Sequence, residues 1–106
     1  MARRVLVATR DLFFRSKIGA VVQAAGAEQT RDEDACDLAV MELGVAGVEA
    51  RIRLLAERGV PVLAFGSHVA ADALRTAREA GAVAVPNSQV EERLRGMLGS
   101  AGAQNV

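Results

Sequence analysis

The chain has 106 residues, and its 13 basic side chains balance 13 acidic ones. This length suits one domain, and a chain of this size buries about two-thirds of its unfolded surface, enough for one core without disulfides or metal. A zero net charge lacks the basic excess typical of nucleic-acid binding, and no apolar run approaches the ~20 residues of a membrane span. We therefore expect a globular domain that binds neither nucleic acid nor membrane.

The single cysteine, Cys36, has no partner for an internal disulfide, so the cytoplasm is the expected location. One histidine and one cysteine do not supply an ordinary zinc site, and we expect neither a metal nor a cofactor. Acidic neighbours are expected to raise the pKa of the Cys36 thiol and keep it unreactive.

Four short, nearly continuous apolar runs predict strands that are covered on both faces of a sheet. They span residues 5–8, 38–41, 62–65 and 83–85. The more polar residues 27–30 are expected to form an edge strand.

Segments with helical spacing alternate with these runs. The first begins after Asp11, the expected N-cap, and stops at Gly26. The second ends at Gly59, with Pro61 just beyond it, and the third covers about residues 70–80.

The fourth helix is predicted from a capping box, in which Ser88 accepts a backbone N–H and Glu91 reaches back to the serine. Its apolar face extends to Leu98, so a single domain is expected over residues 1–98. Residues 99–106 are small and polar and are expected to form a disordered tail.

Strands and helices in alternation predict an α/β fold with a parallel sheet and right-handed crossovers. One connection departs from this pattern, because only the seven residues 31–37 separate residues 27–30 from the next strand. A parallel crossover normally takes a dozen or more residues. Either a short acidic loop replaces a helix here, or residues 27–30 pair differently. The acidic side chains of this loop are expected to be solvated.

Several stretches are similar to those of a known family. They are Val5–Ala8 before an acidic helix start, Asp37–Leu43, the Pro-led Val60–Phe65, and Ala80–Ala82 leading to Val85–Pro86. On these residues the chain resembles a stand-alone response-regulator receiver domain (CheY-like) from about Arg4 to Leu98. The resemblance implies a three-layer, flavodoxin-like α/β fold with a doubly wound parallel five-stranded sheet in the order 2-1-3-4-5. The short 31–37 connection departs from the family, whose members carry a helix there, so the helix between the second and third strands is expected to be missing or shortened. Residues 11–18 and 65–69 are similar to those of a bacterial group of stand-alone receiver-like proteins.

Receiver domains autophosphorylate an aspartate at the end of the third strand. The reaction needs an acidic pair after the first strand that holds Mg²⁺, a Thr or Ser after the fourth strand, and a Lys before the final proline. Each of these positions differs here. The replacements are Thr9 and Arg10 for the acidic pair (with Asp11 one step on), Glu42 for the aspartate, Gly66 for the hydroxyl residue (followed by Ser67), and Val85 for the lysine. The resemblance therefore implies a pseudo-receiver that is not phosphorylated in the family's manner.

Ligands of open parallel sheets collect at the carboxyl ends of the strands. The candidates at this sheet end are Thr9, Arg10, Asp11, Glu42, Gly66, Ser67, His68, Val85 and Asn87. One hypothesis is a bidentate Arg10–Glu42 ion pair that locks the sheet end without phosphate or metal. The alternative is that both side chains point to solvent and interact weakly. Ser67 and His68 are expected to cap the following helix rather than to act in catalysis.

The expected function is a phosphorylation-independent interaction or regulatory module in signal transduction, without an output domain and without enzymatic activity. In the family, helix four, strand five and helix five form the face for dimers and outputs, so the partner is another protein or a second copy. The candidates on that face are Arg75, Arg78, Glu79, Glu91, Glu92 and Arg93.

The main alternative is a small-anion site formed by Arg10, Ser67 and a helix N-terminus. An enzyme has less support, because the sequence shows no nucleophile, base and orienting group together and hence no catalytic residue. Phosphotransfer to Glu42 would lack both the Mg²⁺ ligands and the lysine.

Overall fold

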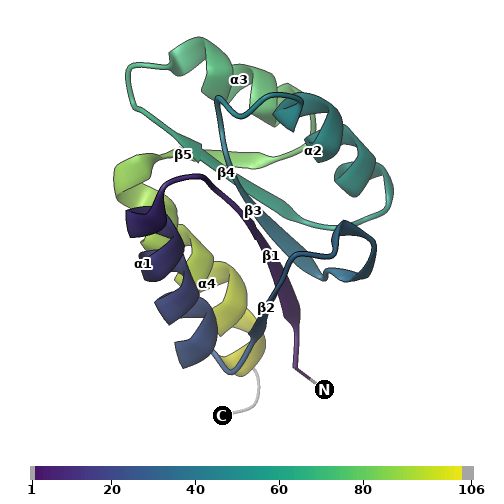
Figure 1. Ribbon diagram of the computed structural model, residues 1–106, viewed down its shortest axis with the longest axis vertical. Coiled ribbons are helices and arrows are strands. Elements are labelled where there is room, and N and C mark those ends of the chain that lie inside the picture. Colours follow the sequence, from purple (N-terminus) through teal and green to yellow (C-terminus); the bar gives the residue numbers. More distant parts are fainter. Residues whose placement is uncertain (1, 104–106) are drawn as a thin grey trace.

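A five-stranded parallel sheet forms the middle layer of the fold (Figure 1). The structure is a computed structural model that describes residues 2–103, with side chains described to residue 99. The strands are β1 (Arg4–Ala8), β2 (Glu28–Thr30), β3 (Leu38–Glu42), β4 (Val62–Gly66) and β5 (Val83–Pro86). Their order is β2-β1-β3-β4-β5, and all four pairings are parallel. The predicted fold class and strand order are confirmed, and β2 is a parallel edge strand beside β1.

Four helices cover the two faces of this sheet in the described part of the chain. Helices α1 (Leu12–Ala24) and α4 (Val90–Ala103) lie side by side on one face, and α2 (Val48–Glu57) and α3 (Ala71–Glu79) lie on the other (Figure 1). Between residues 2 and 103, no helix combines the length and hydropathy of a membrane span. Helix α4 continues past Leu98, so residues 99–103 are helical where the sequence analysis expects a disordered tail. Residues 104–106 of that tail lie outside the described residues.

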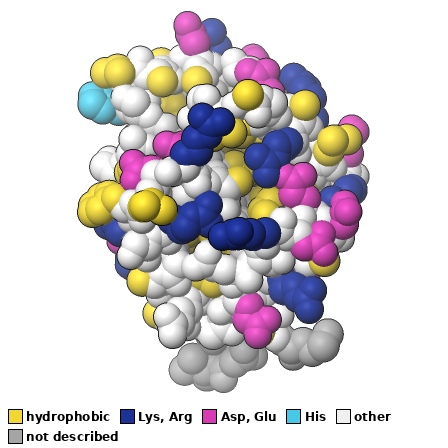
Figure 2. All heavy atoms as spheres, in the orientation of Figure 1, with side chains coloured by type: hydrophobic (Ala, Val, Ile, Leu, Met, Phe, Trp, Pro, Cys, Tyr) yellow, Lys and Arg dark blue, Asp and Glu magenta, His cyan; other side chains and the backbone are white. Residues whose placement is uncertain are grey.

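Burial on both faces explains the continuous apolar runs. Along β1, Val5 and Val7 belong to the core on the α1/α4 side, whereas Leu6 belongs to the core on the α2/α3 side. Phe65 of β4 is fully buried, and its ring centroid lies 5.2 Å from that of Phe14 of α1. The face drawn in Figure 2 carries charged side chains of both signs.

The connection from β2 to β3 contains one 3₁₀ turn, η1 (Glu33–Ala35), in place of a helix. The Asp32 carboxylate accepts the Asp34 backbone N–H at 2.9 Å, and the Thr30 hydroxyl accepts the Asp32 N–H at 3.1 Å. Cys36 is 7% exposed and belongs to the core on the α2/α3 side. The short loop thus carries the chain across β1 and adds a side chain to the core.

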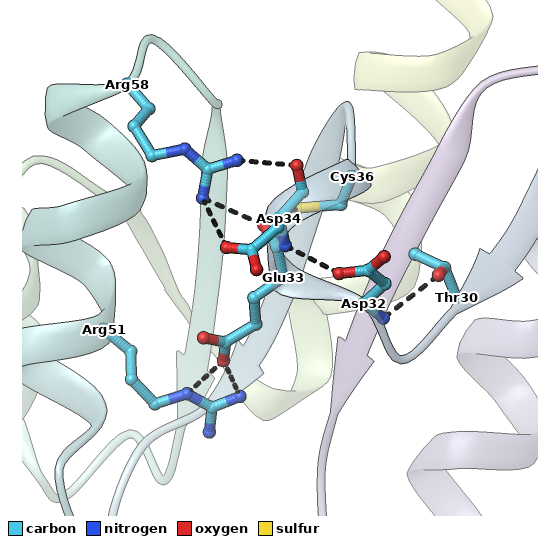
Figure 3. Close-up of polar contacts among 7 residues, drawn as sticks. All are labelled: Thr30, Asp32, Glu33, Asp34, Cys36, Arg51 and Arg58. Carbon is cyan, nitrogen blue, oxygen red and sulfur yellow. Dashed lines mark hydrogen bonds and ion pairs between the residues drawn. The ribbon is translucent and has the colours of Figure 1, made fainter.

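Two arginines of the α2 segment bind this crossover (Figure 3). Arg58, the C-cap of α2, donates to the carbonyl oxygens of Glu33 at 2.9 Å and Asp34 at 3.1 Å. Arg51 pairs with the Glu33 carboxylate. The expectation of a solvated acidic loop is therefore wrong for Glu33, because α2 passes close enough for its arginines to reach it.

We expect Arg58→Met to lower the free energy of unfolding by about 1 kcal/mol, since it removes two charge-assisted hydrogen bonds at a partly exposed site. Arg53→Met is the matched control: Arg53 is exposed on the same helix and makes no hydrogen bond or ion pair among the described residues. We expect it to change stability by less than about 0.5 kcal/mol. Urea unfolding measures both variants, and equal losses would contradict a specific role for Arg58.

Candidate functional site

The carboxyl ends of β1 and β3 are joined by a network of hydrogen bonds at Glu42. Register pairs Ala8 with Met41, which places Thr9 beside Glu42 one residue further on. The Thr9 hydroxyl donates to Glu42 Oε1 at 2.7 Å, and the Arg10 backbone N–H donates to the same oxygen at 3.1 Å. Thr9 Oγ1 in turn accepts the Asp11 N–H at 3.1 Å. Thr9 is only 6% exposed, so its hydroxyl lies at the buried side of this network, whereas the Arg10 N–H contact is exposed.

The predicted Arg10–Glu42 ion pair is wrong. Within residues 2–103, Arg10 contacts Glu42 through its backbone N–H, and no hydrogen bond or ion pair joins the guanidinium to that carboxylate. The short side chain of Thr9 lies in register with Glu42 and donates to it directly. The side chain of Arg10 is exposed and makes no hydrogen bond or ion pair among the described residues. The carboxyl ends of β1 and β3 are joined through the Thr9 hydroxyl and the Arg10 backbone N–H, and not through a cation.

Asp11 is the N-cap of α1, as predicted. Its Oδ1 accepts the N–H groups of Phe13 at 2.9 Å and Phe14 at 3.3 Å. The carboxylate is thereby directed to the N-terminal end of α1. In the described part of the chain, no group of three or more His, Cys, Asp or Glu side chains could hold a metal ion.

The ends of β4 and β5 are apolar at the two positions where the family has a hydroxyl and a lysine. Gly66 is buried, and a Cβ at this position would lie 3.3 Å from both Cβ and Cδ1 of Leu43. Val85 is 4% exposed and belongs to the core on the α1/α4 side. Neither position has a side chain that could donate a hydrogen bond or supply a cation to an anion at Glu42.

The loop after β4 does not cap α3 with a side chain. Ser67 Oγ accepts the Val69 N–H at 3.3 Å in a turn that precedes the helix, and Ala70 is the N-cap of α3. His68 is exposed in the same loop. The predicted cap is therefore wrong, because the chain makes a further turn before the helix starts.

The predicted capping box at α4 is also wrong. Asn87 and Ser88 lie in a 3₁₀ turn, η2 (Asn87–Gln89), and the Glu91 carboxylate pairs with Lys17 of α1 at 2.8 Å. The packing of α1 beside α4 brings Lys17 to Glu91, which a local sequence pattern does not reveal.

Three of the six candidates on the α3, β5 and α4 face have partners within the chain. Arg78 donates to the Ala84 carbonyl oxygen at 2.8 Å, Arg75 pairs with Asp72 at 2.9 Å, and Glu91 pairs with Lys17. The other three, Glu79, Glu92 and Arg93, are exposed and make no hydrogen bond or ion pair among the described residues.

Burial is the main cause that raises the pKa of the Cys36 thiol. The carboxylates of Glu33 and Asp37 raise this pKa further, and Arg58 opposes them. The predicted direction is confirmed, but desolvation contributes more than the acidic neighbours. Cys36 is therefore a core residue whose burial and raised pKa both disfavour the thiolate form.

The sequence analysis missed a groove of about 440 Å³ beside the carboxyl end of β1. Its rim contains four arginines, Arg10, Arg15, Arg31 and Arg51, of which only Arg10 is a predicted site residue. Figure 2 shows basic side chains gathered around a hollow near the middle of the face that it draws. The four come from separate parts of the chain, so no local motif marks them.

No family model and no curated protein matches the chain, but solved structures do. The BeF₃-activated DrrB receiver domain superposes with a TM-score of 0.77 at 15% identity, covering 94% of this chain and 97% of that one. The CheY-like protein TadZ from Pseudomonas aeruginosa superposes with a TM-score of 0.71 at 16% identity, covering 91% and 96%. NtrX from Brucella abortus gives 0.67 at 16% identity over 99% of this chain, which spans only 29% of that chain. The chain therefore has the fold of response-regulator receiver domains.

A double-mutant cycle tests the Thr9–Glu42 hydrogen bond. We expect Thr9→Val to lower the free energy of unfolding by about 1–2 kcal/mol, because it removes a hydrogen bond to a charged group and leaves the Asp11 N–H without its acceptor. Combined with Glu42→Ala, the two losses should be non-additive by more than about 0.5 kcal/mol. Arg10→Met keeps the backbone N–H and should be close to neutral. Additive losses, or a large loss from Arg10→Met, would contradict the network.

Proposed function

We propose that this chain is a receiver-like signalling module that acts by binding another protein, in a state that does not depend on phosphorylation. The observation that carries the proposal is the double hydrogen bond that Glu42 Oε1 accepts from the Thr9 hydroxyl and the Arg10 N–H. In the receiver domains that the chain resembles, this position holds the phosphoacceptor aspartate. Here the carboxylate is already bound by the chain itself.

The chemistry of phosphoryl transfer supports this proposal. Such transfer is largely positioning and charge neutralisation, and it depends on a metal ion and on cationic or hydroxyl groups around the phosphoryl oxygens. Asp11 is committed to the helix cap, and Leu43 lies over Gly66. Val85 is buried in the core. The metal ligands, the hydroxyl group and the lysine that would bind a phosphoryl group are thus replaced by a helix cap and by apolar residues that pack in their place.

The same network supports a fixed conformation of the sheet end. A neutral hydroxyl and an amide join β1 to β3 without a metal ion or an added phosphate. Because Thr9 is buried, the hydrogen bond from its hydroxyl to Glu42 contributes more than it would at a fully exposed position. A module of this kind presents the same surface to its protein partner at all times. Its activity is then regulated by the binding of another molecule and not by phosphorylation.

The β5 edge, with α3 on one side of the sheet and α4 on the other, is the proposed partner surface. Its exposed charges are of both signs, with Glu79, Glu92 and Arg93 making no hydrogen bond or ion pair among the described residues. Val83 adds an apolar side chain that is 38% exposed. Mixed charges on one face suit a self-complementary twofold contact, so a second copy is the first partner to test. We place this interaction in the cytoplasm.

Beryllofluoride with Mg²⁺ tests phosphorylation independence directly. We expect the ¹⁵N amide signals of Glu42, Gly66 and Ser67 to stay unchanged, because the chain lacks the groups that would hold the phosphate analogue. The DrrB receiver domain, described as BeF₃-activated, is the positive control for the reagent. Light scattering of the same samples reports whether two copies associate. Saturable, Mg²⁺-dependent shifts around Glu42 would contradict the proposal.

A further inference from the structure

The arginine-rimmed groove lies over β1, on the side of the sheet where a longer crossover would place a helix. Its floor includes Leu6 and Ala8, which face the α2/α3 side, and Val45 of the loop after β3 lies at its border. The crossover passes this region as a single 3₁₀ turn, which leaves the hollow open. Figure 2 shows hydrophobic atoms between the basic side chains here.

Positive charge dominates the groove. None of its lining residues is acidic. Arg10 and Arg31 are exposed and make no side-chain hydrogen bond or ion pair among the described residues. Arg15 donates one N–H to the Thr9 carbonyl oxygen at 2.7 Å, and Arg51 pairs with Glu33 beside the groove. Like charges around one hollow repel each other, and a bound anion would relieve this repulsion.

The position of the groove in the fold is also that of a ligand site. In a sheet of order 2-1-3-4-5, the chain reverses its direction of winding between β1 and β3, and ligands of such sheets bind outside the carboxyl ends at this point. The groove is lined by the carboxyl-terminal half of β1 and by the loops that follow β1, β2 and β3. Its volume of about 440 Å³ falls within the range of small-molecule sites.

We infer that this groove binds a small phosphorylated organic molecule, about the size of a nucleotide, whose phosphates are held by Arg10 and Arg31. Guanidinium groups match phosphate oxygens in a bidentate geometry, which favours a phosphate over a diffuse negative charge. The organic part lies against the partly exposed Ala8 and Val45. This inference rests on the proposed function and deepens it, since a ligand replaces the phosphoryl group as the input of the module.

The test is an NMR titration of the ¹⁵N-labelled chain with GDP, in a phosphate-free buffer that contains EDTA. Pyrophosphate and guanosine are titrated separately, because each contains one part of the probe. We expect saturable shifts confined to the groove with GDP, weaker binding of pyrophosphate, and no binding of guanosine. Arg10→Met and Arg31→Met should each weaken GDP binding by about tenfold or more, because each removes a charged phosphate contact. Arg53→Met lies outside the groove and should leave the Kd unchanged.

Several outcomes would overturn the inference. They are the absence of saturable shifts with GDP and pyrophosphate, equal binding of guanosine, and equal weakening by Arg53→Met, which would indicate general charge attraction. Arg10 and Arg31 are exposed, so both variants should keep the parental Tm, and loss of binding in a folded variant is interpretable. EDTA removes Mg²⁺, so it distinguishes binding in the groove from metal-dependent binding at Glu42. Binding that requires Mg²⁺ and centres on Glu42 would contradict the proposed function, whereas an inert groove would contradict this inference alone.

Discussion

The length of the connection between β2 and β3 constrains the rest of the structure. Register places Thr30 level with Leu6 and Leu38 level with Val5, so the chain must move sideways by two strand spacings, about 10 Å, and pass over β1. Seven extended residues span at most about 25 Å. That length does not allow the chain to rise into the outer layer, form a helix and return. The crossover therefore stays close to the sheet as a single 3₁₀ turn.

The groups around the crossover depend on this constraint. Cys36 contributes to the core below it, Arg58 binds its carbonyl oxygens, and Arg51 pairs with Glu33. With no helix over β1, the arginines of four separate segments surround an open groove. The sheet end beside it is held differently, by the Thr9 hydroxyl and the Arg10 N–H on the Glu42 carboxylate. Together, the hydrogen-bonded sheet end and the open basic groove are the two observations on which the proposals of a phosphorylation-independent module and of a ligand as its input rest.

The hydrophobic pattern was sufficient to predict the strands and their buried faces, and the strand order followed from the resemblance to receiver domains. The length of the 31–37 loop indicated a replaced helix but left open a different pairing of residues 27–30. The Asp11 cap was also predictable, since its contacts lie within three residues. The Arg10–Glu42 ion pair was wrong, because a sequence does not show whether a backbone or a side-chain group of Arg10 reaches the carboxylate, or that the Thr9 hydroxyl is its other partner. The capping box at α4 failed because Lys17, far away in sequence, reaches Glu91. The groove was missed because its four arginines come together only in the folded chain. They are Arg10, Arg15, Arg31 and Arg51.

Hydrogen exchange at the Arg10 amide tests most directly whether Glu42 is already bound by the chain. This N–H has the Glu42 carboxylate as its acceptor, at 3.1 Å. The account predicts exchange slower than the intrinsic rate by about tenfold or more in the parent chain, and a return toward the intrinsic rate in Glu42→Ala, with global stability measured alongside. Exchange at the unstructured rate in the parent chain, unchanged by Glu42→Ala, would contradict a self-bound carboxylate and the fixed sheet end that follows from it.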